Sequence, residues 1–125
     1  MDTENSGFGG KTWLPVYNRY KEINVQTDSM SDKSVYKYYQ KLLNLRKENE
    51  AFITGTYENI TEDRKGVYIY KRYTDDECYI VVCNFENSNE ISLDFDCEAV
   101  LTNCGQRDIS GIYQPYEYAV FKLNK

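Results

Sequence analysis

CYIVVCNF, residues 78–85, is the stretch that decides the fold. It is a continuous apolar run between two turn-forming segments, TDDE at 74–77 and ENSNE at 86–90. A short apolar run bounded by turns predicts a central strand that is covered on both faces. Cys83 within this run is interpreted as a buried free thiol, which acts as a small apolar residue.

Strand patterns surround this central run at intervals of about ten residues. They are GTYENI (55–60), GVYIYKRY (66–73), EISLDF (90–95), EAVLTN (98–103) and YEYAVFKL (116–123). Two of them alternate cleanly and place apolar residues on one face: Ile91, Leu93 and Phe95, and Ala119, Phe121 and Leu123. Short alternating strands with turns between them predict an antiparallel β-sandwich.

The first third of the chain has a different pattern. Residues 1–30 show no sustained period and are rich in Gly, Asn, Asp and Ser, which predicts an extended loop. A helix follows, with Ser31 or Asp32 as its N-cap, and its pattern ends near Glu50. Its apolar positions recur at helical spacing: Val35, Tyr38, Tyr39, Leu42, Leu43 and Leu45.

One helix and one loop cannot close a core of their own. The boundary between the helical part and the β part is therefore expected near residues 49–53, giving segments 1–50 and 51–125. The apolar side of the helix at Val35, Tyr39 and Leu42 needs a partner. We expect it to dock on the sandwich or to pair two copies in a homodimer.

Composition excludes several classes of partner. The chain has 20 acidic and 15 basic residues and a net charge of −5, which argues against binding to nucleic acid or to an anionic membrane. No run reaches the roughly 18 apolar residues that suggest a membrane span. The polar, acidic start does not resemble a secretion signal, so we expect a cytoplasmic protein.

The chemistry-bearing residues are few. Histidine is absent, which removes the commonest general base and the Ser-His-Asp and Cys-His arrangements. The four cysteines, Cys78, Cys83, Cys97 and Cys104, lack zinc-site spacing and are expected to be reduced. GFGG at 7–10 follows no strand and is no phosphate loop. We expect no metal and no cofactor.

Acidic residues gather at two places. Asp94 and Asp96 lie on the strand face opposite Leu93, and Asp75, Asp76 and Glu77 lie in a turn. Paired carboxylates can perform general acid–base catalysis. Outward positions of strands and turns are normally solvated, and we interpret both groups in that way.

Thirteen tyrosines are the compositional excess. Two groups are dense enough to stack on sugar rings: Tyr36, Tyr38 and Tyr39 in the helix, and Tyr113, Tyr116 and Tyr118 around Pro115. Packing is the commoner use of such aromatics, and we prefer it for both groups.

Several stretches, read in order, resemble glycoside hydrolase family thirteen, the α-amylase superfamily. They are NSGFGGKTWLPV (5–16), YKEINV (20–25), SVYKYYQKLLNLRKENEAFITGTY (34–57), YIVVCNF (79–85) and IYQPYEYAVFKL (112–123). The similarity is greatest to the subgroup of oligo-1,6-glucosidase, α-glucosidase and trehalose-6-phosphate hydrolase.

The resemblance implies an architecture. Residues 1 to about 30 would be the last loop of a (β/α)8 catalytic barrel, and residues 32–49 would be its eighth helix. Residues 52–125 would be the C-terminal Greek-key β-sandwich called domain C. Asn5 and Phe8 match positions near the substrate cleft of relatives and are the only site residues that the resemblance suggests.

The resemblance also implies a function. Relatives are retaining glycosidases that use two carboxylates and a supporting aspartate, and these residues would lie on barrel strands upstream of this chain. We therefore expect a C-terminal, mainly structural fragment of an enzyme that acts on oligosaccharides with α-glucosidic, including α-1,6, linkages. It would be inactive without its barrel. An independent carbohydrate-binding module is the alternative.

Overall fold

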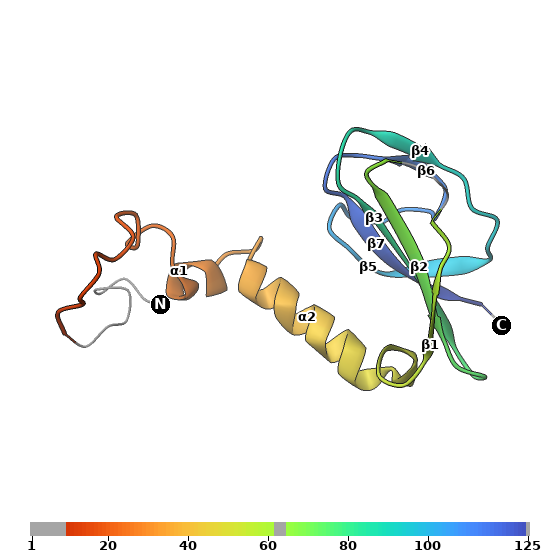
Figure 1. Cartoon of the computed structure of the whole chain (residues 1–125), viewed down its shortest axis with the longest axis horizontal. Coiled ribbons are helices and arrows are strands. Elements are labelled where there is room, and N and C mark those ends of the chain that lie inside the picture. The colour runs from red at the N-terminus through yellow and green to blue at the C-terminus, as the bar shows by residue number, and fades with distance from the viewer. Residues whose placement is uncertain (1–9, 62–64, 125) are drawn as a thin grey trace. The chain divides into compact units, whose positions relative to one another are not determined.

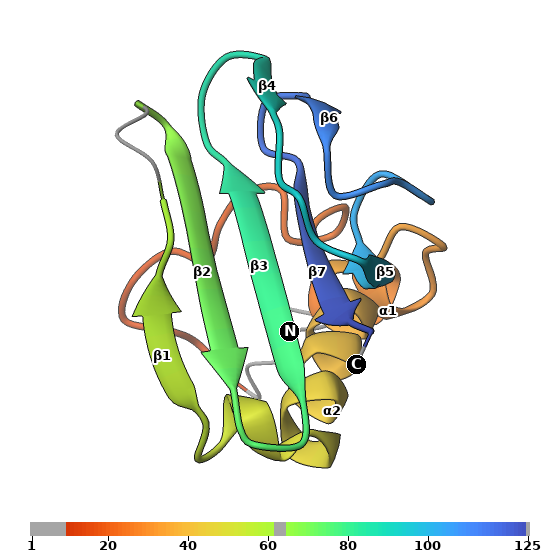
Figure 2. The same ribbon diagram turned by 90° about the vertical axis from the view of Figure 1, so that its right-hand side faces the viewer.

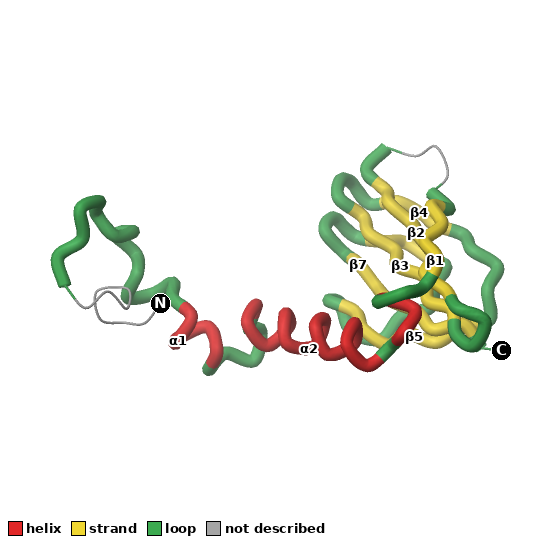
Figure 3. Tube along the Cα trace, turned by 60° about the horizontal axis from the view of Figure 1, so that its bottom comes forward, coloured by secondary structure: helices red, strands yellow, loops and turns green. Residues whose placement is uncertain are grey.

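The computed structural model describes residues 10–61 and 65–124. The chain divides into two compact units, Met1–Glu48 and Asn49–Lys125. The strands all belong to the second unit, where Figure 3 draws them in yellow.

The described residues of the first unit, from 10 onward, form two helices, α1 (Val25–Ser29) and α2 (Val35–Glu48). The expectation of a loop throughout residues 1–30 is therefore wrong at α1. This short helix begins at Asn24, whose Oδ1 accepts a hydrogen bond of 2.7 Å from the main-chain N–H of Thr27. A side-chain cap of this kind stabilises a helix that has little periodicity of its own.

Helix α2 begins later than the sequence predicted. Ser34, rather than Ser31 or Asp32, accepts a 3.0 Å hydrogen bond at its Oγ from the N–H of Lys37. The carboxylate of Asp28 also accepts a 2.8 Å hydrogen bond from the N–H of Tyr36. That bond, with a second from Ser34 Oγ, lowers the pKa of Asp28 below its usual value. Neither helix in the described part of the chain is long and apolar enough to cross a membrane.

The second unit is an antiparallel sandwich of two sheets. The larger sheet has five strands in the order β1-β2-β3-β7-β5, and the smaller pairs β4 with β6. Figures 1 and 2 show this arrangement, with β3 at the centre of the larger sheet. The strands are β1 (Thr56–Asn59), β2 (Val67–Tyr73), β3 (Cys78–Asn84), β4 (Asn89–Ile91), β5 (Cys97–Thr102), β6 (Gly111–Tyr113) and β7 (Tyr118–Leu123). The predicted mainly-β, antiparallel fold is confirmed.

The hydrophobic core lies between the two sheets. Cross-strand register places Ile69 of β2 opposite Val82 of β3, and Val82 opposite Ala119 of β7. Ile91 and Tyr113 close this core from the smaller sheet and are 2% and 0% exposed. The buried members of the core are Val67, Ile69, Ile80, Val82, Ile91, Ile109, Tyr113, Ala119 and Phe121.

The strand predicted at 90–95 is shorter in the structure, but its apolar side chains face the core as predicted. Only its first part is a strand, because Leu93 pairs with a side chain: its N–H donates to Ser110 Oγ at 2.8 Å, and its oxygen accepts from the same hydroxyl at 2.9 Å. Leu93 and Phe95 still pack against the core with Ile91, as their alternation predicted. The three-residue strand β6 was not predicted.

A buried amide joins the two sheets. Asn84, at the end of β3, is 1% exposed. Its Nδ2 lies 3.0 Å from the main-chain oxygen of Asn87 and 2.9 Å from those of Tyr113 and Gln114. Its Oδ1 accepts a hydrogen bond of 3.0 Å from Asn89. Every polar atom of this side chain is thus paired, as burial requires.

Replacement of Asn84 by aspartate should strongly destabilise the sandwich. A carboxylate cannot donate to the three carbonyl oxygens, and it would be buried without a cation. We expect a loss of about 3 kcal/mol in the free energy of unfolding, measured by urea titration. The control is Asn87→Asp at an exposed position, which should change stability little; equal effects of the two substitutions would refute the role of Asn84.

Candidate functional site

The five-stranded sheet has a second face, which points away from the smaller sheet. Side chains alternate along strands, so the neighbours of the core residues Ile69, Val82 and Ala119 occupy this outer face. Register places Tyr70, Val81 and Val120 in one row across it. The outer-face residues of β1, β2, β3 and β7 are Tyr57, Asn59, Tyr68, Tyr70, Arg72, Tyr79, Val81, Cys83, Tyr118, Val120 and Lys122.

Three tyrosines form a cluster on the outer face, and we call Tyr57, Tyr68 and Tyr70 the outer tyrosine cluster. The Tyr57 and Tyr70 ring centroids are 5.6 Å apart, and those of Tyr68 and Tyr70 are 5.2 Å apart. The Tyr57 and Tyr68 hydroxyls are hydrogen-bonded to each other. This bond, with burial second, raises the pKa of Tyr68 to about 12. Tyr57 remains 50% exposed.

One end of the outer face is covered by the segment that enters the sandwich. The 3₁₀ helix η2 (Glu50–Phe52) places Phe52 against Tyr79, with ring centroids 4.7 Å apart. The N–H of Ala51 donates to Glu77 Oε1 at 2.9 Å, which ties this segment to the turn before β3. A Cβ at Gly55 would lie 2.2 Å from the oxygen of Ala51, so the backbone approach requires glycine.

A buried ion pair holds the opposite end of the sandwich. Arg107 pairs with Glu117, and their side chains are 12% and 6% exposed. The Arg107 guanidinium also lies 3.4 Å from the ring centroid of Tyr113, and Glu117 accepts a 3.0 Å hydrogen bond from the N–H of Gln114. Burial raises the pKa of Tyr113 to about 12. These contacts give Glu117, the buried glutamate of the PYEY segment (115–118), a structural role.

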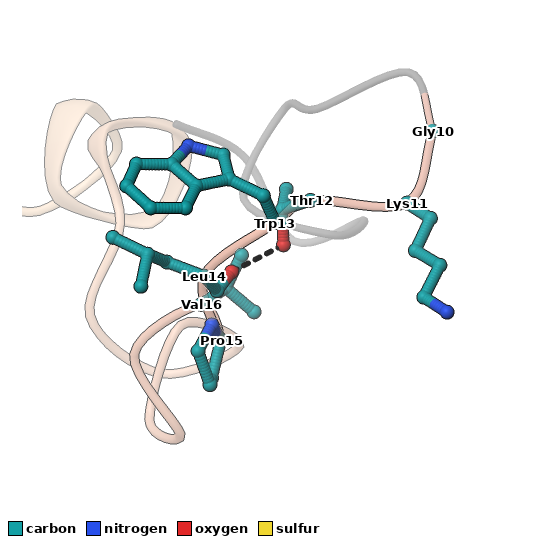
Figure 4. Close-up of a pocket in the computed structure, with 7 residues that line it drawn as sticks. All are labelled: Gly10, Lys11, Thr12, Trp13, Leu14, Pro15 and Val16. Atoms are coloured by element: carbon teal, nitrogen blue, oxygen red, sulfur yellow. Dashed lines mark hydrogen bonds between the residues drawn. The ribbon is translucent and has the colours of Figure 1, made fainter.

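The first unit offers a different kind of surface. The segment 10–16 lines a shallow hollow by itself, with Trp13 on its rim and 91% exposed (Figure 4). Thr12 Oγ1 donates to the main-chain oxygen of Leu14 within it. No acidic residue lines this hollow.

Comparison with known proteins supplies the family. Residues 1–55 match the family model described as the catalytic domain of α-amylase. Oligo-1,6-glucosidase of Halalkalibacterium halodurans is 35% identical over 96% of this chain and 23% of its own length. Trehalose-6-phosphate hydrolase of Bacillus subtilis is 34% identical over 98% of this chain and 24% of its own length.

The solved structures agree. A crystal structure of Bacillus licheniformis trehalose-6-phosphate hydrolase superposes on 99% of this chain with a TM-score of 0.86 and 29% identity, and the match covers 25% of that enzyme. This chain belongs to the α-amylase family. It spans about a quarter of the length of the relatives it matches.

Within this α-amylase-family chain, the two residues predicted to line a substrate cleft cannot be placed. Asn5 and Phe8 lie outside the described residues. The nearest described residues are those of the hollow at 10–16, and they provide an exposed indole rather than a catalytic group.

The acidic residues that the sequence singled out are exposed or take part in hydrogen bonds that hold the fold. Asp94 is exposed, and Asp96 accepts a 3.0 Å hydrogen bond from Asn124. Asp75 and Asp76 are exposed, as predicted, whereas Glu77 is half-buried and binds the N–H of Ala51. In the described ranges, no group of three or more Cys, Asp or Glu side chains is arranged to hold a metal ion.

The three tyrosines around Pro115 occupy different environments. Tyr113 packs in the core, and its hydroxyl donates to the oxygen of Ile109 at 2.7 Å. Tyr116 lies in a turn with a positive φ of 62° and is 75% exposed, while Tyr118 belongs to the outer face. These three therefore form no common platform.

In α2, packing was the preferred role of the tyrosines, but two of the three are largely exposed. Tyr36 and Tyr39 are 46% and 62% exposed, and Tyr38 is half-buried. The sequence did not lead us to the outer tyrosine cluster. Its signal was the alternating tyrosines of GVYIYKRY, and the pairing of Tyr57 with Arg72 was needed to complete it.

Proposed function

We propose that this chain provides the C-terminal, mainly structural part of a retaining α-glucosidase-type glycoside hydrolase, and that it has no hydrolase activity alone. The extent of the match carries this proposal: almost the whole chain aligns, in order, with about a quarter of enzymes named for hydrolysis of oligo-1,6-glucosides or trehalose-6-phosphate. The substrate would be an oligosaccharide with α-glucosidic linkages. Its catalytic carboxylates would lie on barrel strands outside this chain.

The outer face supports a covering role for the sandwich. The outer face carries several tyrosines and one arginine, side chains that are enriched at protein interfaces. Its two valines, Val81 and Val120, are buried within the sheet, whereas Tyr57 is 50% exposed. The occupant that fits best is the (β/α)8 barrel of the same polypeptide, because residues 1–55 match the catalytic domain and β1 begins at Thr56. We further propose that residues 1–50 belong to that barrel and residues 51–125 form domain C.

A cytoplasmic location fits the cysteines. Cys78, Cys83, Cys97 and Cys104 are all free. Reduced thiols are usual in a cytosolic protein and uncommon in a secreted one.

Purified chain should not hydrolyse an aryl α-glucoside. A retaining glycosidase needs two carboxyl groups about 5 Å apart across the glycosidic bond. The acidic residues described above instead cap a helix, as Asp28 does, bind a main-chain N–H, as Glu77 does, or are exposed to solvent. The assay compares released aryl alcohol with a mock preparation, and trehalose-6-phosphate hydrolase of Bacillus subtilis serves as the positive control. Turnover that follows the chain through purification would refute the proposal.

The alternative, an independent carbohydrate-binding module, is favoured by the outer tyrosine cluster alone. Its rings are tilted by 40° and 39° to one another, whereas stacking on sugars uses flat, open ring faces. We expect no change in tyrosine and tryptophan fluorescence on titration with maltose, isomaltose or dextran at millimolar concentration. A saturable change that Tyr57→Ala abolishes would support the binding module instead.

Helix α2 should cause the isolated chain to associate. Val35, Tyr39 and Leu43 are 63%, 62% and 61% exposed, whereas the predicted Leu42 is half-buried. Exposed apolar helix faces tend to find partners, and a homodimer through α2 is the proposed outcome when the barrel is absent.

Light scattering after size-exclusion chromatography measures this association. We expect a dimer whose population falls in the double variant Tyr39→Glu with Leu43→Glu and is retained in the control Asn44→Glu, an exposed polar position of the same helix. A monomeric wild-type chain at high concentration would contradict the homodimer.

A further inference from the structure

Arg72 stands apart from the other cations of the sandwich. It lies on the outer face of β2, opposite Tyr57 of β1 and Tyr79 of β3. Its Nε is buried and has no hydrogen-bond partner in the part of the chain that the structure describes. A buried guanidinium nitrogen without an acceptor is costly, so native proteins rarely retain one without a reason.

Three other cations of the sandwich lie beside an acidic residue. Lys71 pairs with Glu58 at 3.2 Å, and Arg107 pairs with Glu117. Lys122, on the same outer face, has Glu98 directly opposite on β5. Among the ion pairs found between described residues, none includes Arg72.

Tyrosines surround Arg72 on the outer face. The outer tyrosine cluster lies beside it, and the Arg72 charge acts on Tyr70, where it opposes the rise that burial causes in the Tyr70 pKa. Tyrosine and arginine dominate the binding energy of protein interfaces when their neighbours exclude water. An arginine in this setting is best matched by a carboxylate, which accepts two parallel hydrogen bonds.

We propose that Arg72 anchors the outer face to the barrel that covers it, and that the barrel presents a carboxylate to the Arg72 guanidinium. The inference rests on the proposed function, since the barrel is the occupant that it assigns to this face. It goes further by naming one residue of this chain and the chemistry of its partner.

The first test uses this chain alone and compares two arginines. Without its partner, Arg72 contributes no ion pair, so Arg72→Met should leave the thermal midpoint unchanged or raise it. Arg107→Met is the matched control and should lower the midpoint by roughly 10 °C or more, because it leaves Glu117 buried and unpaired. A comparable loss in Arg72→Met would show that Arg72 acts within the sandwich, and the proposal would fail.

The second test supplies the barrel. Residues 1–125 replace the matched quarter of Bacillus subtilis trehalose-6-phosphate hydrolase, and the thermal midpoint of this chimaera is measured. Arg72→Met and Arg72→Gln should both lower it by several degrees, and Arg72→Lys should lower it less because the positive charge remains. Equal midpoints for wild type and Arg72→Gln would exclude a carboxylate partner and overturn the proposal.

The two proposals fail in distinguishable ways. Hydrolysis by the chain alone would contradict the proposed function without involving Arg72. An active chimaera that is insensitive to every Arg72 substitution would contradict the anchor and leave the structural role intact.

Discussion

Strand β3 is buried along nearly its whole length, so both faces of the five-stranded sheet require cover. The inner face is covered by the smaller sheet through Ile91 and Tyr113. On the outer face, Phe52 covers Tyr79 at one end, and the outer tyrosine cluster lies beside the centre. Tyr79 and Val81 of β3 are therefore buried within the unit itself, whereas Tyr57 of β1 stays 50% exposed and is open to a partner.

Polar contacts then fix how the sandwich closes. Asn84 pairs with carbonyl oxygens of the segment that leads into β7, and the ion pair of Arg107 with Glu117 holds the same segment. The side chains of Asn84, Arg107 and Glu117 are all largely buried. Buried polar networks that are fully paired favour one arrangement over others, because any slip leaves a donor or an acceptor unpaired.

Most of the β architecture could be predicted from sequence, because period-two alternation and the apolar run of 78–85 are local signals. Helix α1 and the start of α2 could not be, since they depend on which of several side chains becomes a cap: Asn24 and Ser34 in the structure. The outer tyrosine cluster and Arg72 depend on strand register, which no single stretch of sequence contains. The predicted cleft residues Asn5 and Phe8 stay predictions.

The central claim is that this chain provides structure to a glycosidase and no catalytic group. Activity of the chimaera with Bacillus subtilis trehalose-6-phosphate hydrolase tests it most directly, compared with the same enzyme truncated before the matched quarter. We predict that the chimaera hydrolyses trehalose-6-phosphate and that the truncated enzyme does not. A folded, soluble chimaera without activity, or a fully active truncated enzyme, would contradict the account.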